Sequence, residues 1–140
     1  MTTSNDSANR ESIVKAHIKA VTESHDAPTI LSLFTRVRYE IPALASIIEG
    51  PEAATHLYDN IFSAFPDFYM EADTLHHAEE AIIAEVTFGG TQHGVWAGVQ
   101  PAGKKAVAKG VLIFVFEGDG LVCEKVFFDH GTLLRQLTAA

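Results

Sequence analysis

The first half of the chain carries apolar residues at the three- and four-residue intervals of amphipathic helices. The pattern predicts a helix over residues 10–24 and a second, shorter helix that starts near Asp26, which can cap it. A third helix is expected to begin at residues 50–52 (Gly-Pro-Glu) and to end at Pro66, because proline and an acidic residue suit a first helical turn. Between the last two helices, residues 36–41 alternate as a short strand.

From Phe68 onward the apolar pattern changes to that of strands. Strands are predicted over residues 68–75, 81–88, 106–116 and 121–129, followed by a closing helical turn over 131–137. A glycine-rich excursion over residues 89–103 contains the single tryptophan, Trp96. Helices followed by an antiparallel meander predict an α+β fold, in which a curved, mostly antiparallel sheet wraps around three N-terminal helices.

The two long C-terminal strands are apolar at both alternating sets of positions. Val107 and Val111 belong to one set of the strand over 106–116, and Leu112 and Phe114 belong to the other. A sheet that is apolar on both faces needs cover on both, and the helices cover only one. We therefore expect a homodimer in which a second copy of the chain covers the other face.

Length and composition predict one globular domain. The chain has 140 residues, of which 47% are hydrophobic, and this is enough for a single core without disulfide support. Residues 10–138 form the expected domain, and residues 1–9 read as a disordered, polar N-terminal tail.

Charge and cysteine content exclude several classes of protein. The net charge of −8 argues against a nucleic-acid-binding protein and against docking on anionic lipid. The lone Cys123 excludes a disulfide framework and a multi-cysteine zinc site. Neither a membrane span nor a secretory signal is visible in the sequence, so the expected location is cytoplasmic.

A set of short motifs resembles the SnoaL-like polyketide cyclase family of the nuclear transport factor 2-like superfamily. The motifs lie in order between about residues 10 and 138: Tyr39-Glu40-Ile41-Pro42, Glu49-Gly50-Pro51-Glu52-Ala53, Phe65-Pro66-Asp67, Gly90-Thr91-Gln92-His93-Gly94, Pro101-Ala102-Gly103-Lys104, Gly118-Asp119-Gly120, Phe128-Asp129 and Leu133-Leu134-Arg135-Gln136-Leu137. None is specific alone, and their order and spacing together carry the resemblance.

The resemblance implies a cone-shaped fold with a deep apolar pocket. It also implies a reaction without metal or cofactor: aldol-type cyclisation or isomerisation of a small apolar carbonyl compound by general acid–base catalysis. In the cyclases one acidic residue at the end of the last strand does this work, and the matching residue here is Asp129. The fold also hosts proteins of other activities, so it does not fix the function by itself.

Asp129 has two readings. Aromatic neighbours such as Phe127 and Phe128 are expected to raise the pKa of a carboxyl in the pocket, which would suit a general base. Alternatively, Asp129 caps the closing helical turn, because aspartate is a preferred N-cap residue. The catalytic reading requires that the carboxyl face the pocket.

Other candidates come from the expected pocket and its mouth. His93 is a second catalytic candidate, because a histidine in the glycine-rich bend can titrate near neutral pH; an exposed loop histidine is the alternative. The helix histidine His17 can reach the pocket or serve as a satisfied core residue. The expected substrate-binding residues are Tyr39, Tyr58, Phe62, Trp96, Leu112 and Phe127, with Trp96 as a lid or a packed plug.

Two positions depart from related enzymes. Leu112 stands where the cyclases often carry a polar partner of the catalytic acid, and Ile41 stands where steroid isomerases carry their base. Two functions therefore stay open: a cofactor-free enzyme acting on an apolar carbonyl compound, or a non-catalytic module of the same fold that binds a hydrophobic ligand or dimerises.

Overall fold

The computed structural model describes residues 4–140 of the chain. Its elements, in order, are α1 (Ser4–Glu23), α2 (Ala27–Leu31), β1 (Arg38–Ile41), the 3-10 helix η1 (Pro42–Leu44), β2 (Ser46–Glu49), α3 (Pro51–Ala64), β3 (Tyr69–His77), β4 (Ala81–Thr91), β5 (Lys105–Glu117), β6 (Gly120–Phe128) and α4 (His130–Thr138). Residues 1–3 of the predicted tail lie outside the described residues, and residues 4–9 form the first turns of α1.

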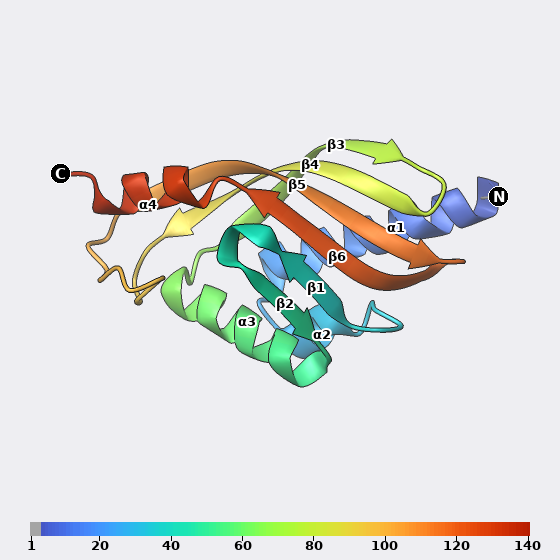
Figure 1. Cartoon of the computed structure of the whole chain (residues 1–140), viewed down its shortest axis with the longest axis horizontal. Coiled ribbons are helices and arrows are strands. Elements are labelled where there is room, and N and C mark those ends of the chain that lie inside the picture. Colours follow the sequence, from blue (N-terminus) through green and yellow to red (C-terminus); the bar gives the residue numbers. More distant parts are fainter. Residues whose placement is uncertain (1–3) are drawn as a thin grey trace.

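The six strands make one curved sheet in the order β2-β1-β6-β5-β4-β3. Strands β3 to β6 form the expected antiparallel meander, and β1 joins β6 in parallel. The helices α1, α2 and α3 precede the meander and pack below the long strands, while the two termini lie at opposite ends of the molecule (Figure 1). The predicted α+β architecture is therefore correct, although the pattern missed β2.

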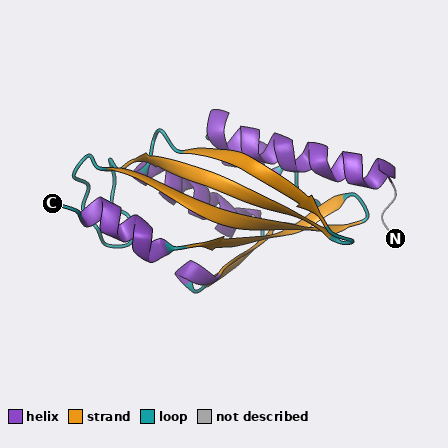
Figure 2. Ribbon diagram, turned by 90° about the horizontal axis from the view of Figure 1, so that it is seen from above, coloured by secondary structure: helices purple, strands orange, loops and turns teal. Residues whose placement is uncertain are grey.

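Helix α1 lies along the sheet (Figure 2) and turns one apolar stripe inward. The stripe consists of Val14, His17, Ile18 and Val21, all buried at the spacing of one helix face. It packs on the inner face of β4 and β5, where Leu112 and Phe114 are fully buried. Because His17 sits within this stripe, the packing of α1 carries an imidazole into the interior.

Arg10 fixes the start of α1 on the sheet. Its guanidinium donates hydrogen bonds to the backbone carbonyls of Gly118 and Glu79, in the turns that join β5 to β6 and β3 to β4. It also lies 5.4 Å from the centre of the Phe116 ring. The side chain thus holds two hairpin turns against one helix, and it fixes the depth at which the apolar stripe of α1 lies.

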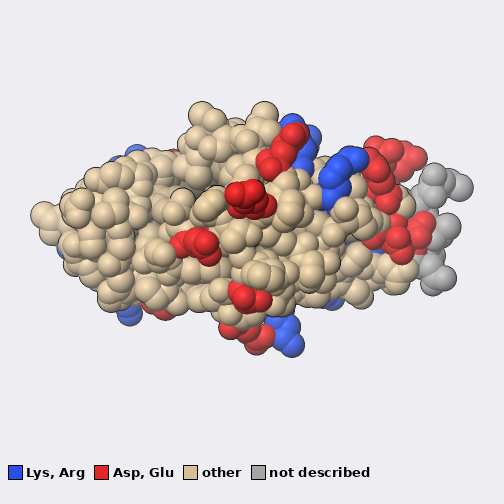
Figure 3. Space-filling model, turned by 90° about the horizontal axis from the view of Figure 1, so that it is seen from below, with Lys and Arg blue, Asp and Glu red and all other residues tan. Residues whose placement is uncertain are grey.

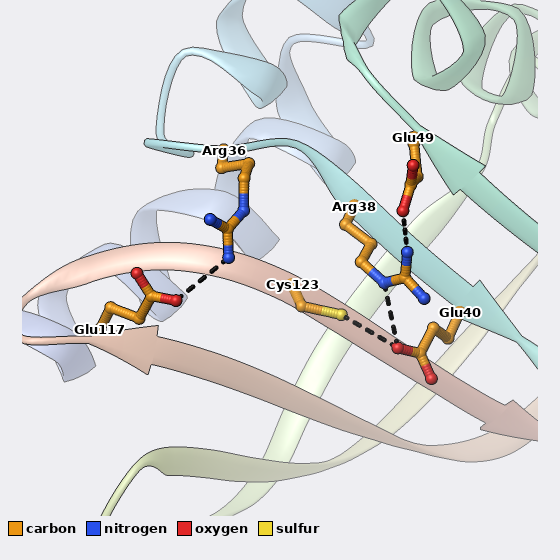
Figure 4. A network of polar contacts seen from close by, with 6 residues as sticks. All are labelled: Arg36, Arg38, Glu40, Glu49, Glu117 and Cys123. Atoms are coloured by element: carbon orange, nitrogen blue, oxygen red, sulfur yellow. Dashed lines mark hydrogen bonds and ion pairs between the residues drawn. The ribbon is translucent and has the colours of Figure 1, made fainter.

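The outer face of the sheet remains apolar over its centre. Val107 and Val111 on β5 and Phe127 on β6 are 48%, 36% and 42% exposed, respectively. A polar network borders this area near β1 and β2 (Figure 4). In it, Arg38 donates to both Glu40 and Glu49.

Coverage of this outer face by a second copy of the chain stays a prediction. We expect the purified protein to have twice the mass of one chain in light scattering after size exclusion. Val111→Lys places a charge in the centre of the apolar area and is expected to weaken the dimer about tenfold or more. Val95→Lys is the matched control, because Val95 is 55% exposed outside the sheet. A wild-type monomer at micromolar concentration would contradict the expectation.

Candidate functional site

A pocket lies between the inner face of the sheet and the helices α1 and α3. Its walls are almost entirely aromatic and aliphatic: Leu44, Leu57, Ile61, Phe65, Phe68, Met70, Phe88, Trp96, Leu112, Val126, Phe128 and Leu133. The volume of this cavity that is open to water-sized spheres is about 100 Å³. That is less than the roughly 300–1,000 Å³ of typical ligand pockets, so the occupant is small or the walls move to admit it.

One end of the pocket holds a buried carboxylate. Glu124 on β6 is 3% exposed, and its Oε1 lies 2.8 Å from Nε2 of His17 on α1, which is 1% exposed. Among the described residues, no hydrogen-bond partner is found for Nδ1 of His17. Oε1 of Glu124 likewise has no hydrogen-bond partner among these residues, so the two side chains form a close buried contact between imidazole and carboxyl group.

Two tyrosine hydroxyls extend this polar end. The hydroxyl oxygens of Tyr39 on β1 and Tyr58 on α3 are 2.6 Å apart, and both side chains are buried. Burial, followed by the nearby charge of Glu124, raises the pKa of Tyr39 well above its usual value. The same causes, in the same order, raise the pKa of Tyr58 well above its usual value. Both phenols consequently remain hydrogen-bond donors in the neutral pH range.

The strand register explains why Glu124 faces inward. Glu124 pairs with Phe114, Val126 with Leu112, and Phe128 with Gly110, so these β6 residues share the inner face with the buried positions of β5. Sequence reasoning did not find Glu124, although the signal was available. It is an acid in phase with Val126 and Phe128, and this alternation is typical of an inward position in an apolar strand.

The prediction that Asp129 lies in the pocket is wrong. Its side chain is 68% exposed and caps α4, because its carboxylate accepts hydrogen bonds from the backbone N–H and the hydroxyl of Thr132. These hydrogen bonds lower the pKa of Asp129 instead of raising it, with the hydroxyl as the largest cause. The physical reason is parity: Asp129 follows the inward Phe128 and so leaves the inner face as the strand ends.

The other candidates from the sequence occupy different places. His93 is exposed, and its ring is not part of the pocket wall. Tyr39, Tyr58, Trp96 and Leu112 line the pocket, whereas Phe62 lies behind Tyr58, with their ring centres 5.7 Å apart. Phe127 contributes to the wall, but it pairs with Val111 and its side chain is exposed on the outer face.

Comparison with protein families gives a match over residues 13–137 to the model of the SnoaL-like polyketide cyclases. The chain belongs to this family. The match covers most of the chain, including the residues His17, Tyr39, Tyr58 and Glu124. No curated protein matches the chain at a significant level.

Solved structures share the fold of this SnoaL-like protein at low sequence identity. TsrD from Streptomyces laurentii is 22% identical, with a TM-score of 0.80 over 95% of this chain and 97% of its own. IdmH from Streptomyces antibioticus, a proposed polyketide cyclase, is 17% identical, with a TM-score of 0.76 over 91% and 97%. A protein with a ketosteroid isomerase-like fold from Catenulispora acidiphila is 16% identical, with a TM-score of 0.77 over 89% and 91%.

Among the described residues, no helix combines the length and the apolar character needed to cross a membrane.

Proposed function

We propose that this SnoaL-like protein catalyses acid–base chemistry on a small apolar carbonyl compound, with Glu124 as the base in place of Asp129. One observation carries the proposal: a carboxylate, an imidazole and two phenols meet at one end of a pocket whose other walls are apolar. Buried ionisable groups of this kind cluster at functional sites, because burying them costs stability that function can justify.

The first step is proton abstraction next to the carbonyl. A carboxylate oxygen of Glu124 takes a proton from the carbon adjacent to the substrate carbonyl, and the C–H bonding pair moves to give an enolate. The charge of Glu124 helps to raise the pKa of Tyr39, so the phenol is near the carboxyl group, and in this proposal a carbonyl oxygen bound beside it accepts a hydrogen bond from its hydroxyl. Donors placed at a developing oxyanion contribute strongly to such reactions.

The second step closes the cycle without any further reactant. In an aldol-type cyclisation, the enolate carbon attacks a second carbonyl carbon of the same molecule, a C–C bond forms, and the new alkoxide takes the proton back from Glu124. In an isomerisation, the same proton returns to a different carbon. In this proposal His17 is a positioning residue, because its Nε2 lies 2.8 Å from Oε1 of Glu124 and the ring packs beside the carboxyl group.

A non-catalytic ligand-binding function is the second candidate. It is favoured by the pairing of the polar groups with one another, since Tyr39 contacts Tyr58 and His17 contacts Glu124. In that reading the network stabilises the pocket floor and the apolar walls retain a hydrophobic ligand. The two candidates differ in one measurable property, which is proton transfer to and from a bound carbonyl compound.

Deuterium exchange at the acidic carbons of 2-tetralone tests the proposal without knowledge of the natural substrate. We expect the wild-type protein to accelerate the exchange in D₂O, as followed by NMR, and Glu124→Gln to reduce it to the buffer rate. Asp129→Asn is the matched control and should exchange like the wild type, because asparagine also caps a helix. Saturation transfer reports binding independently, so binding without exchange would favour the second candidate and overturn the first.

A further inference from the structure

Residues 92–103, which we call the cover loop, close over the end of the pocket opposite Glu124. Glu124 pairs with Phe114 on β5, and Gly90, two residues before the loop, pairs with Ala106. Phe114 and Ala106 are eight residues apart on the strand, or about 26 Å at the usual rise. The cover loop therefore lies far from the polar groups and beside the apolar part of the pocket.

The base of the cover loop is firmly built. Gln92 is fully buried, its backbone N–H donates to Lys104, and its side-chain amide donates to the carbonyls of Gly94 and Val99. The N–H groups of His93 and Gly94 both donate to the carbonyl of Ala64 at the end of α3. A Cβ at Gly94 would stand only 2.5 Å from the backbone oxygen of Ser63, so this close approach requires glycine.

The tip of the cover loop is a two-residue turn. Trp96 and Val99 exchange two backbone hydrogen bonds of 3.2 and 2.8 Å. Ala97 and Gly98 between them have positive φ angles of +48° and +78°, as a type I′ turn requires. Beyond this turn, the residues from Gln100 to Gly103 are exposed, so this part of the loop buries little surface that would hold it in place.

Trp96 connects this tip to the body of the protein. Its indole N–H donates to Nε2 of His130, the first residue of α4, at 3.0 Å. The indole also meets the rings of His130 and Phe65 edge to face, with centres 6.2 and 5.8 Å apart. Trp96 lines the pocket at the same time, so one side chain both closes the cavity wall and attaches the loop.

We propose that Trp96 and His130 form a latch that controls entry of the ligand into the pocket. The tip of the cover loop opens about the base at Gln92 and Gly94 when two hydrogen bonds break, from the indole to His130 and from the Gln92 side chain to the carbonyl of Val99. Opening also enlarges the small closed cavity, because it moves the aromatic side chain of Trp96 out of the cavity wall. The inference rests on the proposed function only in taking this pocket as the ligand site.

The surface around the latch suits an uncharged ligand. The cover loop contains no Asp, Glu, Lys or Arg. The end of the molecule that carries α4 and this loop shows few charged side chains, in contrast to the end near the N-terminus (Figure 3). An apolar compound that approaches the cover loop itself meets no side chain of this loop that must lose the hydration of a full charge.

The latch can be tested without any ligand, because the chain contains a single tryptophan. The one indole N–H signal in the NMR spectrum reports hydrogen exchange at Trp96 directly. His130→Phe keeps an aromatic ring for the edge-to-face contact but removes the acceptor, and we expect the exchange to become about three- to tenfold faster. His130→Gln retains an acceptor and should restore most of the protection. His56→Phe, at an exposed position on α3, should behave like the wild type.

Entry is measured with the neutral dye 1-N-phenylnaphthylamine in stopped-flow fluorescence. We expect His130→Phe to raise the association and dissociation rate constants of the dye together, by about three- to tenfold, with the equilibrium constant changed less than twofold. Unchanged indole exchange in His130→Phe would overturn the latch. Faster exchange with unchanged dye kinetics would also overturn it, because the tryptophan would then move without controlling entry.

The outcomes separate this inference from the proposed function. Loss of 2-tetralone exchange in Glu124→Gln concerns the chemistry at the polar end, whereas indole exchange concerns only the cover loop. Thermal unfolding of His130→Phe, followed by circular dichroism, verifies that α4 remains folded. A wild-type indole that exchanges as fast as a free tryptophan side chain would show that the latch is not closed in solution, and it too would overturn the inference.

Discussion

His17→Leu is expected to lower the free energy of unfolding by about 3–5 kcal/mol, because it leaves a carboxylate buried without its imidazole partner. Glu124 is 3% exposed, so water cannot replace the lost donor. Leucine has a volume close to that of histidine and remains within the apolar stripe of α1, so the loss of packing is the smaller effect. Urea unfolding at neutral pH, followed by circular dichroism, measures the change.

The reverse substitution and the double variant separate the charge from the packing. Glu124→Leu leaves a buried imidazole without its carboxyl neighbour, which costs about 1–3 kcal/mol, less than an unpaired carboxylate. Replacing both residues by leucine is expected to recover most of the stability lost in His17→Leu, since an apolar pair of similar size is often as stable as a buried ion pair. A double variant as unstable as His17→Leu would show that the cost comes from the lost shape and not from the charge.

The elements of the fold could be predicted because their signals are local. The first turn of α3 contains Pro51 and Glu52, α2 is capped by Asp26 through the N–H of Thr29, and the turn after Glu117 joins the antiparallel strands β5 and β6. β2 was missed because only one of its faces is half-buried and its two isoleucines do not alternate. Its place is fixed by pairing with β1 rather than by its own pattern.

The site was harder to predict because it depends on which face each strand residue takes. Asp129 and Glu124 belong to the same strand region, and a difference of one residue in parity decides which of them reaches the pocket. The aromatic neighbours of Asp129 suggested burial, but Phe127 is exposed while Phe128 points inward. Its capping hydrogen bond to Thr132 was the better guide, and it was visible as the alternative reading.

Contacts between distant segments gave no sequence signal at all. Trp96 and His130 are 34 positions apart, and nothing in either segment indicates that their side chains meet. The same holds for His17 and Glu124, which are joined only when α1 packs across the sheet. The sequence pattern can indicate each of these residues by itself, but it cannot indicate which of them meet, because pairing is a property of the tertiary structure.

Tyr39→Phe is expected to slow the exchange of 2-tetralone protons by about 10²–10³-fold, the loss typical of removing one oxyanion donor. Tyr39 and Glu124 both line the pocket, and the proposal places the hydroxyl of Tyr39 at the carbonyl oxygen next to the carbon that loses its proton. Phenylalanine keeps the ring and its contacts with Phe34 and Tyr58. The variant should bind 2-tetralone with unchanged affinity in saturation-transfer titrations, because the loss belongs to the transition state.

Tyr58→Phe is the matched control, since Tyr58 contacts the hydroxyl of Tyr39 and lies one step farther from Glu124. We expect a loss of about tenfold at most. Alkaline unfolding provides an independent measurement: burial raises the pKa of both phenols in the folded protein, whereas tyrosines of the unfolded chain ionise at about pH 10. The contribution of the two phenols to the free energy of unfolding is therefore fully present below that pH and is lost as the pH rises above it. Each phenylalanine variant should therefore lose less stability at alkaline pH than the wild type. In the exchange experiment, equal rates in Tyr39→Phe and the wild type would exclude Tyr39 as the oxyanion donor.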